Sequence, residues 1–258
     1  MNEVKHPYEV ALMKGKNEPE LIIVQQNVCG RNIYERTWSI QDYEELIKEV
    51  KGKNPDIIFL TEFYYQQMYD VTKIILEGYE FIKPSRFSKN DEEQKGLYAT
   101  CLLAIKKAKV TKDKQFELMN MLDLRYICVD LNIKNEKIMK TLLLYVPQTY
   151  NAPPYRVKQK EKMLRSTSNY VSGKYNNLLF VGGDMNSDID GKTTTCIGVF
   201  EEIYNKIVDT DCIKEATWKG KRLDYALVSE KIKNKVNTIP IKIKSDHRGL
   251  KTVFSALK

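Results

Sequence analysis

The apolar stretches of this chain are short. Ile57–Leu60, Leu142–Val146 and Leu178–Val181 each have the length of a β-strand, and none approaches the roughly 18 residues that a membrane-spanning helix requires. A chain with this pattern builds its core from sheets. Strands rich in Ile, Leu, Val, Tyr and Phe are predicted at Leu21–Gln26, Asp56–Thr61, Tyr98–Lys106, Tyr126–Ile133, Lys140–Val146, Asn177–Gly182, Leu223–Ser229 and Lys251–Phe254.

Helical patterns lie between some of these strands. The clearest covers Ile40–Lys51, with Ser39 as its candidate N-cap, and weaker ones cover Tyr64–Leu76 and Tyr155–Val171. The strands predicted between residues 98 and 146 follow one another with short polar breaks, which favours antiparallel pairing. We therefore expect an α/β layered protein with mostly antiparallel or mixed sheets and helices on the outer faces.

No segment of the 258 residues is rich in Pro, Gly and Ser, and no internal repeat marks a domain boundary. We predict a single domain over residues 1–258, with residues 1–20 as a peripheral N-terminal segment. That segment lacks the continuous apolar run of a secretory signal. The five cysteines are irregularly spaced and indicate neither a disulfide framework nor a C-x-x-C zinc site. A soluble, cytoplasmic protein is expected.

The charge balance is basic. Lys and Arg number 42 against 34 Asp and Glu, a formal net charge of +8. This excess is compatible with a polyanionic partner such as nucleic acid or anionic lipid, but the lysines are spread along the chain and a lysine-rich composition explains them equally well. The histidines are His6 and His247 alone, which excludes a metal site with three histidine ligands.

Several predicted strands end in a polar residue beside a turn. Asn27 follows LIIVQQ, Glu62 follows DIIFLT and Asp184 follows NLLFVGG. Each alone is explained by turn formation, but loops at strand ends are also where sites are built on rigid scaffolds. In GGDMNS the glycines permit close approach of a ligand, and Asp184 lies two residues from Asn186. This pair suits a carboxylate that takes a proton from water beside an amide that positions the water or a phosphate.

A further acidic group lies inside an apolar run. Asp224 stands in KRLDYALVS, where a buried charge requires a partner. KIKSDHRG supplies Asp246 and His247 just before the last predicted strand. If Asp224 accepts a hydrogen bond from His247, it fixes the tautomer and favours the imidazolium. Acidic ligands without cysteine pairs or histidine clusters favour a hard divalent cation such as magnesium, with Glu62 as the leading ligand candidate.

Taken in order, these motifs closely resemble the endonuclease/exonuclease/phosphatase superfamily over nearly the whole chain. GDMN, then LDYALVS, then SDH, preceded by Q-N and T-E after strands, form a far more specific composite than any one motif. The resemblance implies an α/β fold, a four-layer α/β/β/α sandwich (DNase I-like), with two mostly antiparallel or mixed sheets flanked by helices. The residues that carry it are Asn27, Glu62, Tyr145, Asp184, Asn186, Asp224, Ser245, Asp246 and His247.

The resemblance also implies attack of water on a phosphorus centre, with Mg²⁺ or Mn²⁺ as the cofactor. Glu62 would bind the metal, Asn27 would help to hold metal or phosphate, and Asp246 would contribute near the metal. Metal and protein donors would together stabilise the negative charge that develops on the phosphoryl oxygens.

By the same resemblance, Asp184 would orient and deprotonate the attacking water, with Asn186 beside it, and His247, oriented by Asp224, would stabilise the phosphoryl oxygens. Tyr145 lies in YVPQ. DNase I and sphingomyelinase relatives usually carry a histidine there, whereas exonuclease III and abasic-site endonucleases carry tyrosine in a Y-x-P segment. The match favours exonuclease III-type chemistry, in which the Tyr145 hydroxyl assists phosphate binding or the leaving oxygen.

Two features depart from the abasic-site enzymes. Asp184 and Asp224 are separated by 40 residues, a shorter spacing than in those enzymes. Cys29 stands two residues after Asn27, where several nucleases have Asp or Asn near the metal. Candidate substrate-binding residues that can stack on bases or hold phosphates are Arg31, Tyr150, Arg156 and Trp218.

The leading prediction is a magnesium-dependent nuclease that hydrolyses DNA phosphodiester bonds, acting as a monomer without an obligate protein partner. The alternative is a phosphatase or phosphodiesterase for a small molecule or lipid head group, which the short segment between Asp184 and Asp224 favours. A remote alternative is a non-catalytic nucleic-acid-binding protein on the same scaffold.

Overall fold

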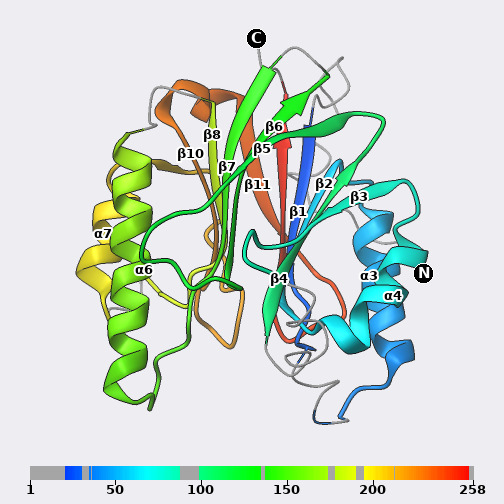
Figure 1. The fold of residues 1–258 in the computed structure, drawn as a ribbon, viewed down its shortest axis with the longest axis horizontal. Coiled ribbons are helices and arrows are strands. Elements are labelled where there is room, and N and C mark those ends of the chain that lie inside the picture. Colours follow the sequence, from blue (N-terminus) through cyan, green and yellow to red (C-terminus); the bar gives the residue numbers. More distant parts are fainter. Residues whose placement is uncertain are drawn as a thin grey trace.

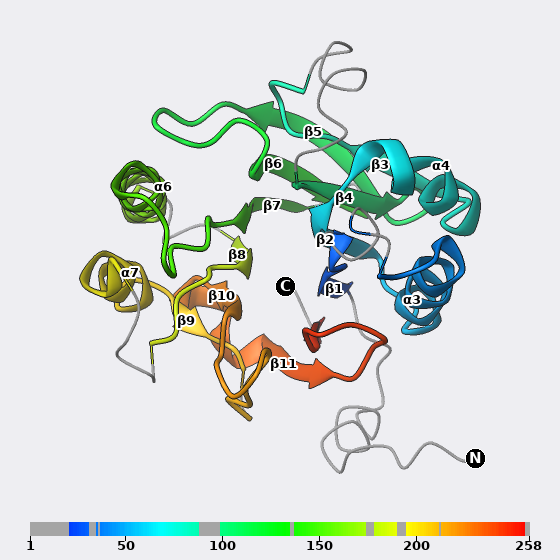
Figure 2. The same cartoon turned by 90° about the horizontal axis from the view of Figure 1, so that it is seen from below.

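The strand-forming segments gather into two sheets that face each other, with helices on the two outer faces (Figure 1). This computed structural model describes residues 21–30, 35, 37–87, 99–134, 137–173, 178–189, 195–211 and 213–255. The N-terminal segment predicted over residues 1–20 lies outside the described residues. A view turned by 90° shows helices, sheet, sheet and helices in succession (Figure 2). The predicted α/β/β/α sandwich is therefore confirmed.

The first sheet joins strands from both ends of the chain. It contains β1 (Leu21–Asn27), β2 (Ile57–Phe63), β3 (Tyr79–Ile82), β4 (Thr100–Lys106), β11 (Val236–Ile241) and β12 (Gly249–Phe254). Their order is β11-β12-β1-β2-β4-β3. β1 and β2 are parallel, with Asn27 opposite Thr61, and the other neighbours are antiparallel. The carboxyl ends of β1 and β2 therefore meet at one edge.

The second sheet has the same kind of mixed pairing and is built from strands in the middle of the sequence. It contains β5 (Val110–Phe116), β6 (Tyr126–Ile133), β7 (Lys137–Tyr145), β8 (Leu179–Asp184), β9 (Val208–Asp209) and β10 (Asp224–Val228). Their order is β5-β6-β7-β8-β10-β9. β7 and β8 are parallel and the other neighbours are antiparallel. The expectation of mixed sheets is confirmed.

Within the described residues, two helices cover each sheet. α3 (Ile40–Gly52) and α4 (Tyr65–Ile75) pack on the first sheet, and α6 (Pro154–Ser172) and α7 (Ile197–Tyr204) pack on the second (Figures 1 and 2). A short 3₁₀ helix (Glu230–Lys235) precedes β11. None of the helices within the described residues combines the length and apolarity that crossing a bilayer requires.

Helix α3 begins where the sequence predicts. The Ser39 hydroxyl accepts a hydrogen bond from the Asp42 backbone N–H, and the Asp42 carboxylate accepts one from the Ser39 N–H. This reciprocal capping satisfies backbone donors that the first helical turn leaves without partners. The apolar stripe of α3, which includes Tyr43, Leu46 and Val50, is fully buried against the sheet.

The core explains why the strands are apolar on both faces. In β2, Ile57 and Phe59 face the second sheet, whereas Ile58 and Leu60 face the layer of α3 and α4. All four are essentially inaccessible to solvent. Burial of one such side chain contributes roughly 1.5–3 kcal/mol relative to exposure. Both faces of the central strands therefore hold the layers together, and the polar residues that end those strands are carried on a rigid support.

The pairing predicted for the strands between residues 98 and 146 is wrong for β4. β6 and β7 are antiparallel neighbours as predicted, but β4 pairs with β2 and β3 in the other sheet. The chain changes sheets through β5, which the sequence does not predict because its residues 111–114, TKDK, are all exposed at the sheet edge. The short elements β3, β9 and α7 and the edge strand β11 are likewise not predicted.

Candidate active site

Five of the predicted site residues lie at the ends of strands. Asn27, Tyr145 and Asp184 are the last residues of β1, β7 and β8, Asp224 is the first of β10, and Glu62 is the second-last of β2. The pairing places Asp184 between Tyr145 and Asp224. The Asn27 amide Nδ2 donates to Asp184 Oδ2 at 3.2 Å, which joins the two sheets at this edge.

The backbone is strained where these side chains project. Glu62 has a φ of 54° at a bulge between Thr61 and Phe63, and Asn186 has a φ of 44°. Non-glycine residues rarely adopt this left-handed region, and such strain gathers at functional sites. Gly30 lies so close to Glu62 that an added Cβ would stand 2.0 Å from the Glu62 carbonyl oxygen. A glycine is therefore required there for the Glu62 turn to close.

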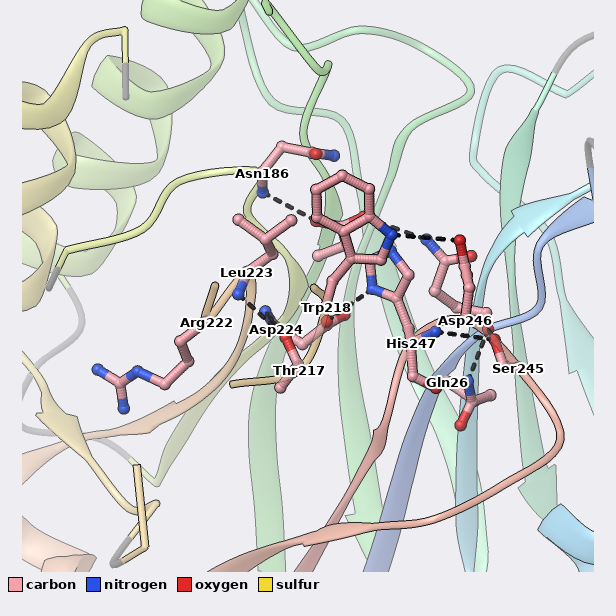
Figure 3. A network of polar contacts seen from close by, with 12 residues as sticks. Gln26, Asn186, Thr217, Trp218, Arg222, Leu223, Asp224, Ser245, Asp246 and His247 are labelled. Carbon is pink, nitrogen blue, oxygen red and sulfur yellow. Dashed lines mark hydrogen bonds and ion pairs between the residues drawn. The ribbon is translucent and has the colours of Figure 1, made fainter. Parts of the chain in front are cut away.

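His247 forms an ion pair with Asp224 inside the site. Its Nδ1 lies 2.9 Å from Asp224 Oδ2, and both residues are buried (Figure 3). Burial opposes protonation of the ring, but the Asp224 carboxylate outweighs it and raises the pKa of His247 to about 10. The ring is therefore an imidazolium near neutral pH, and its Nε2 remains available as a donor. Asp224 is in turn fixed by the Thr217 hydroxyl, which accepts from its backbone N–H at 3.2 Å.

Asp184 is a buried carboxyl group held by donors. The Asn186 backbone N–H donates to Asp184 Oδ1 at 2.8 Å. Burial, followed by the negative charge of Asp224, raises the pKa of Asp184 above its usual range, while the His247 cation opposes the rise. A carboxylate with a raised pKa is a stronger base, which suits removal of a proton from water. The amide of Asn186 donates to the Val146 carbonyl at 2.9 Å.

Oxygen atoms of Asp184 and Asp224 and a ring nitrogen of His247 lie within 4.8 Å of one another. Proximity alone would allow this group to hold a metal ion. The imidazolium that Asp224 stabilises is a cation, however, and a metal ligand must be neutral imidazole. We therefore interpret the three as a charge-paired group that accepts and stabilises protons rather than as the metal centre.

A metal ion fits better at the neighbouring oxygen ligands. Burial raises the pKa of Glu62, and the opposing influences are the His247 charge and the Asn27 amide. The Tyr145 hydroxyl donates to Glu62 Oε1 at 3.3 Å. Four carboxylates lie in this region, those of Glu62, Asp184, Asp224 and Asp246. Among the described residues, the one cation that forms an ion pair with any of them is His247. Carboxylate and amide oxygens around excess negative charge are the donor set of a hard divalent cation.

Asp246 lies at the exposed rim of the site. Its Oδ2 accepts a hydrogen bond of 3.2 Å from the Trp218 indole, and its Oδ1 contacts the Cys29 thiol. Burial, followed by the Asp246 charge, raises the pKa of Cys29, so this sulfur stays protonated. The half-buried Trp218 ring is tilted beside the His247 ring with 6.1 Å between their centroids (Figure 3). Trp218 thus lies beside Asp246 and His247, and its role as a substrate contact stays a prediction.

The remaining candidate substrate residues have different positions. Arg156 is exposed in the first turn of α6. Tyr150 is 78% exposed in the loop between β7 and α6, and among the described residues no contact joins its side chain to the site. Arg31 lies outside the described residues.

The sequence does not predict two residues that support the site. Lys160 of α6 is fully buried, and its Nζ donates to the Asn186 carbonyl at 2.6 Å. Burial lowers the pKa of Lys160 to about 8. The helical spacing that places Lys160 on the face of Met163 and Leu164 is the signal that marks it as buried. Arg125 is the second such residue, and its guanidinium lies 4.4 Å from the centre of the Tyr145 ring.

Solved structures share this architecture over nearly the whole chain. An AP endonuclease from Archaeoglobus fulgidus is 16% identical, with a TM-score of 0.68 over 92% of this chain and 100% of its own. TDP2 from D. rerio, complexed with single-strand DNA product, is 16% identical, with a TM-score of 0.66 over 92% and 99%. A mannosyl-6-phosphatase from Bacteroides thetaiotaomicron is 16% identical, with a TM-score of 0.62 over 90% and 98%.

No protein-family model and no curated protein matches the sequence. The likeness is one of fold, and it agrees with the order of motifs along the chain. The chain therefore has the four-layer fold of the endonuclease/exonuclease/phosphatase superfamily.

Proposed function

We propose that this protein is a divalent-metal-dependent phosphoester hydrolase and that its substrate is DNA. The observation that carries the proposal is the contact of Asn27 with Asp184 across the two sheets, beside the His247–Asp224 ion pair. It brings a candidate metal ligand, a base and a cation to one point. The DNA bound to the TDP2 neighbour and the name of the AP endonuclease support a nucleic-acid substrate.

In this mechanism Asp184 accepts the proton of the attacking water. The Asn27 amide and the Asn186 N–H hold its carboxylate in place. The imidazolium of His247 donates to the phosphoryl oxygens as negative charge develops on them. The pKa of Tyr145 is raised, first by burial and then by the Glu62 charge, so its hydroxyl stays protonated and can donate to the phosphate or leaving oxygen.

Glu62, Asn27 and Asp246 would hold the cation, which Mg²⁺ or Mn²⁺ would satisfy. When bound, a divalent cation supplies charge stabilisation at the phosphoryl group and lowers the pKa of water. We also propose that the protein is a cytoplasmic monomer of one domain. Among the described residues, Cys29, Cys101 and Cys196 form no disulfide, which supports the cytoplasm, because that compartment keeps thiols reduced.

The proposal is tested with wild type and Asp184→Asn, incubated with labelled single-stranded, double-stranded and abasic-site DNA in magnesium and then in chelator. Asparagine keeps the shape of the side chain but cannot accept a proton, so cleavage should fall at least about 1,000-fold while the circular dichroism spectrum is unchanged. Full activity of Asp184→Asn would refute the role of Asp184. The product ladder would distinguish exonuclease action from incision at the abasic site.

A phosphatase or phosphodiesterase for small molecules is the second candidate. The mannosyl-6-phosphatase neighbour and the short segment between Asp184 and Asp224 favour it. Release of phosphate from sugar or inositol phosphates, with no cleavage of any oligonucleotide, would favour this reading over the nuclease. Tight magnesium-independent binding of DNA without turnover of any phosphoester would instead identify a binding protein.

A further inference from the structure

A cavity of about 520 Å³ opens beside the catalytic residues, at the N-terminal end of α6. One wall comes from the segment that precedes β6 and carries Leu122 and Leu124, and the other from Pro147 and the first turn of α6. Its volume lies within the roughly 300–1,000 Å³ of ligand pockets. None of its lining residues belongs to the catalytic set described above.

The lining combines apolar surface with positive charge. Leu122, Leu124 and Tyr155 supply apolar surface, and Tyr155 is 59% exposed. Arg125 and Arg156 supply two guanidinium groups, and neither is ion-paired with a carboxylate among the described residues. Among the described residues, no acidic side chain lines the cavity. Its ligand should therefore have a flat or apolar part and at least one negative charge.

Arg125 connects the cavity with the catalytic site. Its guanidinium lies 4.4 Å from the centre of the Tyr145 ring, and the Tyr145 hydroxyl donates to Glu62. A single side chain, Tyr145, thus separates the cavity from the proposed metal and phosphate site. A group in the cavity would therefore lie close enough to a phosphate held at that site to belong to the same molecule.

We propose that this cavity binds the nucleoside attached to the scissile phosphate, with its base against Tyr155 and the leucines and the neighbouring phosphate on Arg156. The inference rests on the proposed function and specifies its substrate. Stacking on aromatic rings tolerates any base, and arginine pairs with phosphate in a bidentate manner. A free sugar phosphate fits less well, because among the described lining residues only Gln159 and the Tyr155 hydroxyl offer uncharged hydrogen-bonding side chains.

The test uses two single-stranded DNA substrates of equal length and charge, one of ordinary nucleotides and one of abasic tetrahydrofuran units. Wild type should cleave the ordinary strand with about tenfold higher kcat/KM, the factor expected from one base stacked on an aromatic ring. Tyr155→Ala should abolish that preference. Arg156→Gln should weaken cleavage of both strands, because both carry the phosphate. Arg165→Gln, an exposed arginine farther along the same helix, should change neither.

Binding of a fluorescent thymidine oligomer in chelator separates this inference from the proposed function. Weaker binding by Tyr155→Ala and Arg156→Gln, but not by Arg165→Gln, supports the cavity even if no phosphoester is hydrolysed. Cleavage of DNA by wild type, with Tyr155→Ala retaining both the preference for bases and the affinity, would overturn the cavity assignment and leave the hydrolase proposal intact. Equal binding by all variants would overturn it as well.

Discussion

The His247–Asp224 pair makes the sharpest prediction of how the site depends on pH. In Asp224→Asn, the carboxylate that raises the pKa of His247 to about 10 is lost, while the burial that opposes protonation remains. The pKa should fall to at most its ordinary value of about 6.5. At pH 8 the imidazolium fraction then drops from about 99% to about 3%, so we expect kcat/KM to fall about 30-fold or more at that pH.

The variant should change the falling limb of the pH profile. Asp224 raises the pKa of Asp184 and the His247 cation lowers it, so the variant removes two opposing influences on Asp184 once His247 is neutral. The pH–rate profile of Asp224→Asn should therefore gain a falling limb above about pH 6.5. Wild type should keep its activity until the pH approaches about 10.

The assay measures kcat/KM across pH 5–10 on a labelled oligonucleotide and follows the histidine ring by NMR. His247 is one of two histidines, so a His6→Ala background leaves a single ring signal to titrate. Glu230→Gln, which alters an exposed pair with Lys233, is the control. A pKa of His247 that stays near 10 in Asp224→Asn would refute the pairing. A lowered pKa with kcat/KM unchanged at pH 8 would show that catalysis does not need the imidazolium.

Three further variants test separate parts of the site and fold. Lys160→Met removes a charged hydrogen bond worth about 1.5–3 kcal/mol to the Asn186 turn, so kcat should fall about tenfold or more with KM little changed, and Lys160→Arg should recover part of it. Glu62→Gln should abolish calorimetric binding of Mg²⁺ while Tm is retained; unchanged metal affinity would exclude Glu62 as a ligand. Ser39→Ala should lower the free energy of unfolding by about 1 kcal/mol in urea titration without altering kcat.

Stability should also depend on pH through His247. Because its folded pKa is raised to about 10, the pair contributes stability that is complete below the unfolded pKa of about 6.5 and is lost as pH rises through the folded pKa. The Tm of wild type relative to Asp224→Asn should therefore decline over that interval. A constant difference in Tm from pH 6 to 10 would contradict the linkage.

The ends of the central strands could be predicted from sequence because these strands are buried on both faces and are therefore continuously apolar. Ile57–Leu60 is continuously apolar, since successive residues face the other sheet and the helices, and this marks the point at which Glu62 emerges. Register could not be predicted in the same way. Asp184 lies opposite Tyr145 because β8 pairs in parallel with β7, and opposite Asp224 because β8 pairs antiparallel with β10. The sequence does not show which strands pair.

The buried cations near the site could not be predicted from sequence because their positions depend on long-range contacts. Lys160 reads as one of several lysines in a basic segment, yet a fold that packs α6 on the second sheet buries it against the Asn186 turn. Arg125 directly precedes β6, and it is adjacent to Tyr145 because β6 pairs with β7, although 20 residues separate the two. Residue chemistry predicted the acids, amide and histidine that the fold brings together, and tertiary packing adds the cations Lys160 and Arg125 beside them.

The site separates groups that accept protons from groups that keep them. His247 is held as a cation by Asp224, and burial together with the Glu62 charge keeps the Tyr145 hydroxyl protonated. Asp184 is the proposed proton acceptor, since no lysine or arginine within the described residues forms an ion pair with it. Its raised pKa makes it a stronger base. In the proposed mechanism, one acceptor between two donors defines a direction for proton transfer, from water to Asp184 on one side and from a donor to the leaving oxygen on the other. Among the described residues His247 is the one imidazole at this site, and the proposed mechanism requires no second one.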